Sequence, residues 1–133
     1  MVANNNVDLI RQAFHAQAEG DLGPAQELID GDAVIHVPGA LEQGDLRGID
    51  GMAKLILDLL GRSDGTFATS LIDAIGIGDI VTTLNQVTAT RDGQTLSYNT
   101  VWTFRFHGNK VVEAWLHPSR PEKEIAQFYG FGR

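Results

Sequence analysis

Three long strands in the second half of the chain constrain its fold more than any other feature. Residues 82–91, 96–106 and 110–117 are rich in β-branched and aromatic side chains. The turn dipeptides Asp92-Gly93 and Gly108-Asn109 separate them, which predicts two tight hairpins. Strands of this length bend into a curved sheet, and the concave side of such a sheet needs apolar cover.

The first half of the chain supplies that cover. Helical spacing of apolar residues predicts helices at 7–19, 22–29 and 49–60, the last capped by Gly61. Two further strands are expected at 33–37 and 66–77, and residues 118–133 are expected to contain a short helix or packing arm. This order predicts an α+β fold, with N-terminal helices packed on the concave face of a curved antiparallel sheet. One domain spanning residues 1–133 is expected.

Composition excludes several classes of function. A net charge of −7 without a Lys/Arg cluster argues against nucleic-acid binding. The absence of Cys rules out disulfides and thiol chemistry, and the four His residues lack metal-ligand spacing, so no metal and no cofactor is expected. No apolar run approaches the roughly 20 residues of a membrane span, and residues 1–6 lack a signal-peptide pattern. We therefore expect a cytoplasmic protein without a membrane partner.

Five motifs together resemble a known family. They are Glu19-Gly20-Asp21, the segment 32–39 that ends in Pro-Gly, Gly44-x-x-x-Gly48, the aromatic segment 102–106, and 110–115 after the second turn. The pattern resembles the nuclear transport factor 2-like superfamily, in its SnoaL-like polyketide cyclase and ketosteroid-isomerase-like branch. The resemblance implies a cone-shaped, cystatin-like fold with a pocket between the helices and the sheet. It also implies a homodimer formed through the outer sheet face.

Strand alternation predicts which side chains enter that pocket. Trp102 matches the position of the isomerases' oxyanion-hole acid, so it is expected to face inward as a pocket wall. The expected substrate-binding residues are Phe14, Tyr98, Thr100, Trp102 and Leu116. Asn85 is a candidate catalytic residue, because its amide can orient a substrate carbonyl or stabilise an oxyanion. The alternative for Asn85 is a hydrogen bond to backbone.

His36 is the candidate general base. It is a single titratable residue in the apolar strand, and it matches the isomerases' base position. The alternative is a structural histidine. In the favoured register of the last strand, Ala114 and Leu116 face inward and Trp115 faces outward. A shift by one residue would turn His117 inward as a second candidate base.

Two functions follow from these residues. The first is a cofactor-free enzyme that cyclises, isomerises or dehydrates an apolar, polyketide-like carbonyl compound, as an isomerase or lyase with His36 as base. Steroid isomerisation by the family's own mechanism is disfavoured, because Trp102 and Ala13 stand where its two oxyanion donors are expected. The second is a non-catalytic protein that sequesters an apolar ligand in the same pocket.

Overall fold

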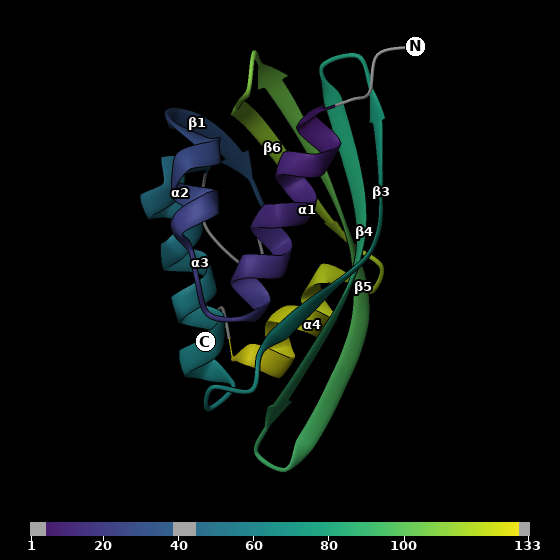
Figure 1. Cartoon of the computed structure of the whole chain (residues 1–133). Coiled ribbons are helices and arrows are strands. Elements are labelled where there is room, and N and C mark those ends of the chain that lie inside the picture. The colour runs from purple at the N-terminus through teal and green to yellow at the C-terminus, as the bar shows by residue number, and fades with distance from the viewer. Residues whose placement is uncertain (1–4, 39–44, 131–133) are drawn as a thin grey trace.

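The structure, a computed structural model, describes residues 5–38 and 45–130. It has an α+β fold in which helices cover one face of a curved six-stranded sheet (Figure 1). The elements in chain order are α1 (Asn5–Ala18), α2 (Gly23–Leu28), β1 (Ile29–His36), β2 (Leu46–Arg47), α3 (Gly48–Arg62), β3 (Ala68–Ile77), β4 (Ile80–Arg91), β5 (Gln94–His107), β6 (Lys110–Pro118) and α4 (Glu122–Tyr129). The predicted fold class is confirmed.

The strands lie in the order β2-β1-β6-β5-β4-β3. Tight turns join β4 to β5 and β5 to β6, as predicted. At the first turn Asp92 and Gly93 have φ of 52° and 78°, the two positive values that a type I′ hairpin turn requires. One pair differs from the expected antiparallel pattern: β1 runs parallel to β6, with Ile35 opposite Ala114. The first strand of the chain therefore pairs directly with the last one.

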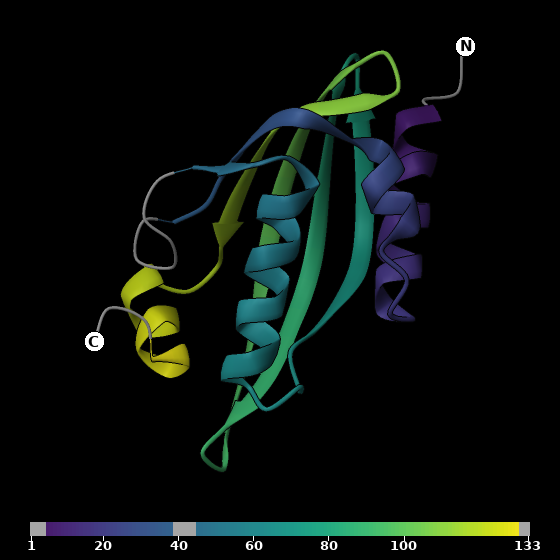
Figure 2. The same cartoon turned by 90° about the vertical axis from the view of Figure 1, so that its left-hand side faces the viewer.

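Helices α1 and α3 lie across the concave face of the sheet, with α3 in front of the strands in Figure 2. Helix α3 buries Met52, Leu55 and Leu59 along one side, as its amphipathic spacing predicts. Gly48 starts this helix with φ of +61°, and a Cβ there would lie 2.5 Å from the carbonyl oxygen of Gly31. Only glycine fits this junction without strain, which explains one half of the Gly44-x-x-x-Gly48 motif. Gly44 lies outside the described residues.

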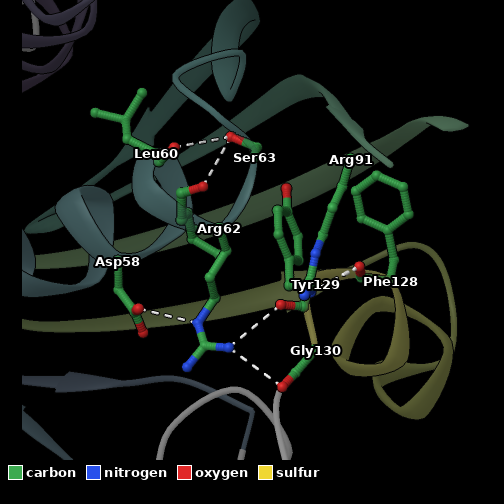
Figure 3. Close-up of polar contacts among 9 residues, drawn as sticks. Asp58, Leu60, Arg62, Ser63, Arg91, Phe128, Tyr129 and Gly130 are labelled. Atoms are coloured by element: carbon green, nitrogen blue, oxygen red, sulfur yellow. Dashed lines mark hydrogen bonds and ion pairs between the residues drawn. The ribbon is translucent and has the colours of Figure 1, made fainter. Parts of the chain in front are cut away.

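Helix α4 closes one end of the structure, held by two arginines (Figure 3). Arg62 donates to the backbone oxygens of Tyr129 and Gly130 at 3.3 and 3.2 Å, and Arg91 donates to that of Phe128 at 3.2 Å. These carbonyls end a helix, where the positive guanidinium groups are favourable. Tyr129 is fully buried, so the tail is a helix that belongs to the core.

Several features of the secondary structure differ from the sequence predictions. β1 begins at Ile29, earlier than the expected residue 33, because Ile29 pairs with Val111 of β6. The two-residue strand β2 was not predicted. Gly61 is not the C-cap of α3, since the helix continues to Arg62 and Ser63 ends it. Ser63 is fully buried, and its hydroxyl donates to the Leu59 carbonyl oxygen at 2.8 Å.

Candidate functional site

An apolar cavity lies between the concave face of the sheet and helices α1 to α3. Its volume, counted as the space open to a water-sized sphere, is about 90 Å³. The helices and strands contribute apolar side chains almost throughout, and the lining residues include Ile10, Phe14, Met52, Leu55, Ile56, Leu59, Val87, Trp102, Phe104, Val111 and Leu116. Such a surface favours an apolar molecule over water.

Three aromatic rings form one wall of the cavity. Trp102 and Phe104 stack with ring centroids 5.5 Å apart and an interplanar angle of 15°. Phe14 of α1 meets Phe104 edge-on at 6.3 Å. Both strand residues are buried, so their rings are held in place by packing before any ligand arrives. The aromatic wall is therefore preformed.

Two buried polar atoms on the sheet face lack partners. Asn85 of β4 and Thr100 of β5 are direct cross-strand neighbours, exposed by 0% and 4%. The Asn85 amide nitrogen donates to the Thr83 hydroxyl at 2.9 Å. The Asn85 Oδ1 and Thr100 Oγ1 atoms have no hydrogen-bond partner among the residues that the structure describes. Unpaired buried polar groups are costly, so this pair is an unusual feature of an apolar site.

Tyr98 marks the end of the cavity nearest α4. It lines the cavity, and its hydroxyl lies 3.3 Å from the hydroxyl of Tyr129. Burial, with the nearby Tyr129 as a second cause, raises the pKa of Tyr98 far above its ordinary value. Tyr98 therefore stays a neutral phenol and cannot act as a base near neutral pH.

His36 lies on the opposite face of the sheet from the cavity, which corrects the prediction that it faces the pocket. In β1 the fully buried Ile35 points toward the core, and side chains alternate between faces, so the next residue must point outward. The His36 ring stacks on Trp115 of β6, with centroids 5.5 Å apart. It is absent from the cavity lining.

His36 instead belongs to a charged cluster on the outer face. Its Nδ1 lies 2.9 Å from Asp45 and its Nε2 lies 2.7 Å from Glu113. Carboxylates only accept hydrogen bonds, so the imidazolium form of the ring, with a proton on each nitrogen, satisfies both contacts. The hydrogen bond to Glu113, with a further one to Asp45, raises the pKa of His36 despite partial burial. The structure thus favours the structural role for His36.

The same cluster holds a second cation. Arg105 donates to the other carboxylate oxygen of Glu113 at 3.0 Å. The hydrogen bonds from His36 and then Arg105 lower the pKa of Glu113. The four side chains, His36, Asp45, Arg105 and Glu113, carry two positive and two negative charges, so the cluster is neutral overall.

Comparisons with known proteins agree with this architecture. The sequence profile of the SnoaL-like domain matches residues 10–114. The chain belongs to the SnoaL-like domain family. An uncharacterized protein of Mycobacterium tuberculosis, Rv0034, is 32% identical over 128 residues, which cover 92% of this chain and 97% of that protein.

Solved structures extend the likeness to the whole fold. Bal32a, from a soil-derived mobile gene cassette, superposes with a TM-score of 0.83 at 25% identity, covering 93% of this chain and 95% of its own. IdmH of Streptomyces antibioticus, a candidate polyketide cyclase, superposes with a TM-score of 0.76 at 20% identity, covering 93% and 99%. A protein of Xanthomonas campestris described as having a cystatin-like fold superposes with a TM-score of 0.80 at 27% identity, covering 93% of this chain and 97% of its own. The SnoaL-like chain therefore shares the cystatin-like fold.

The remaining predicted site residues lie on the concave face of this SnoaL-like domain. Phe14, Tyr98, Thr100, Trp102 and Leu116 line the cavity, and Asn85 lies beside Thr100 without being part of the lining. The favoured register of β6 is present: Leu116 lines the cavity, whereas Glu113 and Trp115 contact His36 on the outer face. His117 is exposed. The roles assigned to these residues stay predictions.

Sequence reasoning missed much of the helical wall as part of the site. Helix α3 contributes Met52, Ala53, Leu55, Ile56 and Leu59, and α1 contributes Gln17 near Phe14. The signal was present in the apolar spacing of α3, which was interpreted as core packing alone. Within residues 5–38 and 45–130, no group of three His, Asp or Glu side chains is suited to hold a metal ion. No helix there is long and apolar enough to cross a membrane.

Proposed function

We propose that this SnoaL-like protein binds an apolar small molecule in the cavity between its helices and its sheet. The observation that carries the proposal is the lining itself: preformed aromatic and aliphatic walls around an open space that continues to the surface. Burying the apolar surface of a ligand there provides the binding free energy. Trp102 and Phe104 add preformed aromatic surface to this lining, which favours an apolar aromatic ligand.

The lining supports binding more strongly than acid–base catalysis. A general base must lie within about 3 Å of the proton that it removes, directly or through one water. The described lining residues include no Asp, Glu, His, Lys or Arg. Tyr98 is held neutral by burial, and His36 lies across the sheet with both nitrogens engaged. Cofactor-free isomerisation or dehydration with His36 as base therefore lacks its essential group.

Cyclisation of a polyketide-like substrate is a second candidate, favoured by the polar atoms of Asn85 and Thr100 beside the cavity. A flexible chain folded against the aromatic wall would bring its reacting carbons together, which accelerates ring closure without an acid or base. A hydrogen bond at the polar pair would then orient one oxygen of the chain. The test is turnover: ring closure must be faster with the protein, and Trp102→Ala must abolish the gain.

The two tryptophans allow a direct test of binding. Trp102 lines the cavity and Trp115 lies on the outer face, and the chain has no others. In Trp115→Phe only Trp102 emits, and in Trp102→Phe only Trp115 does. We expect 1,4-naphthoquinone, a flat apolar quencher, to quench Trp102 with saturation and Trp115 only weakly and linearly. The absence of Cys removes thiol addition to the quinone as a side reaction.

A cavity-filling variant locates the binding. Ala53→Leu adds bulk to the lining, and it should weaken saturable quenching of Trp102 by about tenfold or more. Ala68→Leu on the exposed part of β3 is the matched control and should leave quenching unchanged. Equal, unsaturable quenching of both tryptophans would show that the cavity binds no apolar molecule.

A further inference from the structure

We infer that the ligand of this cavity carries a neutral hydroxyl group, which docks between Asn85 and Thr100. This inference rests on the proposed binding function and names the chemical class of the ligand: a phenol or enol on a flat apolar body. Its basis is the pair of unpartnered oxygens on the concave face, Asn85 Oδ1 and Thr100 Oγ1.

The two side chains are direct cross-strand neighbours on the concave face. Asn85 and Thr100 are opposite each other in the β4–β5 ladder, and opposite side chains in such a pair have Cβ atoms about 5 Å apart. Thr100 lines the cavity and Asn85 lies beside it, outside the lining, so a ligand group that reaches the Thr100 hydroxyl would be next to the Asn85 amide. The concave face is therefore polar at this point and apolar around it.

The chemistry of the pair selects a hydroxyl. The Asn85 amide nitrogen donates one N–H to Thr83, and the unpartnered atom is the carbonyl oxygen, which only accepts. A ligand carbonyl or ether is also only an acceptor, so it cannot satisfy Asn85. A hydroxyl donates to Asn85 Oδ1 and accepts from the Thr100 hydroxyl at the same time. An ammonium group would donate as well, but no carboxylate of the described lining would neutralise its charge.

The position of the pair indicates what the hydroxyl is attached to. Thr100 and Trp102 are two residues apart on the same face of β5, and Trp102 stacks on Phe104. A hydroxyl held at Thr100 therefore places the adjoining part of the ligand on the aromatic wall. An aromatic or enolic ring satisfies both contacts, since its hydroxyl lies in the plane of a flat apolar body.

Three naphthalenes of similar shape separate the hydrogen-bond requirement from apolar binding. 2-Naphthol both donates and accepts, 2-methoxynaphthalene only accepts, and 2-methylnaphthalene does neither. Equilibrium dialysis near neutral pH against the full chain gives the three dissociation constants. We expect 2-naphthol to bind at least about tenfold more tightly than 2-methylnaphthalene, and also more tightly than 2-methoxynaphthalene.

Variants assign the preference to the pair. Thr100→Val keeps the shape of the side chain and removes its hydroxyl, and Asn85→Leu removes the acceptor. Each should reduce the preference for 2-naphthol to within about threefold while 2-methylnaphthalene still binds. Thr88→Val, exposed on the outer face of β4, is the matched control and should keep the full preference. A circular-dichroism spectrum of each variant checks that it is folded.

The outcomes distinguish this inference from the proposed function. Equal affinity for all three naphthalenes, or a preference that survives in both cavity variants, overturns the hydroxyl assignment and leaves apolar binding in place. Equal affinity of 2-methoxynaphthalene and 2-naphthol overturns the donor requirement. Failure of every naphthalene to bind, together with unsaturable quenching by the quinone, overturns the proposed function and the inference with it.

Discussion

The Nε2 atom of His36 lies 2.7 Å from a carboxylate oxygen of Glu113, on the face of the sheet turned away from the cavity. The two residues come from β1 and β6, and the parallel pairing of these strands brings them together. Asp45 contacts the other ring nitrogen, so the protonated ring can donate a hydrogen bond to each carboxylate. The contacts thus favour the cationic form of His36, which joins two strands.

This contact predicts a pH-dependent contribution to stability. The pKa of His36 is raised in the folded state, so its contribution is complete below its ordinary pKa of 6.5 and is lost as pH rises through the raised value. The pKa of Glu113 is lowered, so its contribution is complete above its ordinary 4.5 and is lost as pH falls through the lowered value. Their mutual stabilisation is therefore greatest between pH 4.5 and 6.5.

Thermal unfolding of His36→Gln across this range tests the assignment. Between pH 4.5 and 6.5 we expect the Tm of His36→Gln to be roughly 1–3 °C below that of the native chain. The difference is small because partly exposed ion pairs contribute little, and it should shrink at alkaline pH. His107→Gln, exposed at the end of β5, serves as control and should match the native chain throughout. Quinone quenching of Trp102 should be unchanged in His36→Gln, and a large loss of it would contradict the outer-face position.

Removing the unpaired hydroxyl of Thr100 should stabilise the fold. Thr100→Val replaces a buried, unpartnered oxygen with a methyl group of similar size, and we expect the free energy of unfolding to rise by about 1 kcal/mol. Thr83→Val is the matched comparison on β4, since its hydroxyl accepts from Asn85, and it should lower stability by about 1–2 kcal/mol. Urea unfolding measures both. A change of the same sign in the free energy of unfolding of both variants would show that the Thr100 hydroxyl already has a hydrogen-bond partner.

The arginine contacts predict how firmly α4 is docked. Arg62→Met keeps the aliphatic stem and removes the hydrogen bonds to Tyr129 and Gly130. We therefore expect the free energy of unfolding to fall by about 1–2 kcal/mol. Hydrogen exchange should accelerate in α4 before it does in β5. Arg120→Met, which breaks an exposed pair with Glu124 within one helical turn, should change stability by less than about 0.5 kcal/mol. Uniform acceleration in both elements would show that α4 does not open separately.

We predict that two copies of the chain form a homodimer through the outer sheet face. Ile75 and Leu84 are 63% and 37% exposed there, and helices cover only the opposite face. If two copies pair through this face, Leu84→Lys and Ile75→Lys should shift the sedimentation equilibrium toward monomer. Leu57→Lys, at an exposed position of α3, is the control and should not. A native chain that stays monomeric at high concentration would disprove the expectation.

Local signals made the hairpins and the concave face predictable from sequence. Asp92-Gly93 and Gly108-Asn109 fix two turns through neighbouring residues alone, and once the turns are set, the alternation of β4 and β5 places Asn85, Thr100 and Trp102 on one face. The unpaired state of Asn85 Oδ1 was beyond such reasoning, because it depends on which side chains reach that point of the folded sheet.

The prediction that His36 faces the pocket was wrong for a different reason. Residues 34–37 read Val-Ile-His-Val, in which neither face is marked by polar residues, so alternation cannot choose between them. Family resemblance placed His36 inward, whereas packing of Ile35 in the core turned it outward. Its partner Glu113 lies on a strand that pairs with β1 only in the tertiary structure. A charged partner that distant in sequence leaves no local pattern.

The parallel pairing of β1 with β6 also has a kinetic consequence. His36 and Glu113 are 77 positions apart, so the first strand must wait, unpaired on that edge, until nearly the whole meander exists. Bringing the two ends of so long a segment together costs conformational entropy before the contacts between β1 and β6 can stabilise the chain. We therefore expect docking of β1 to be a late step of folding, after the hairpins of β4, β5 and β6 have formed. The stacking of His36 on Trp115 gives that step its own fluorescent reporter, on the face of the sheet opposite the cavity.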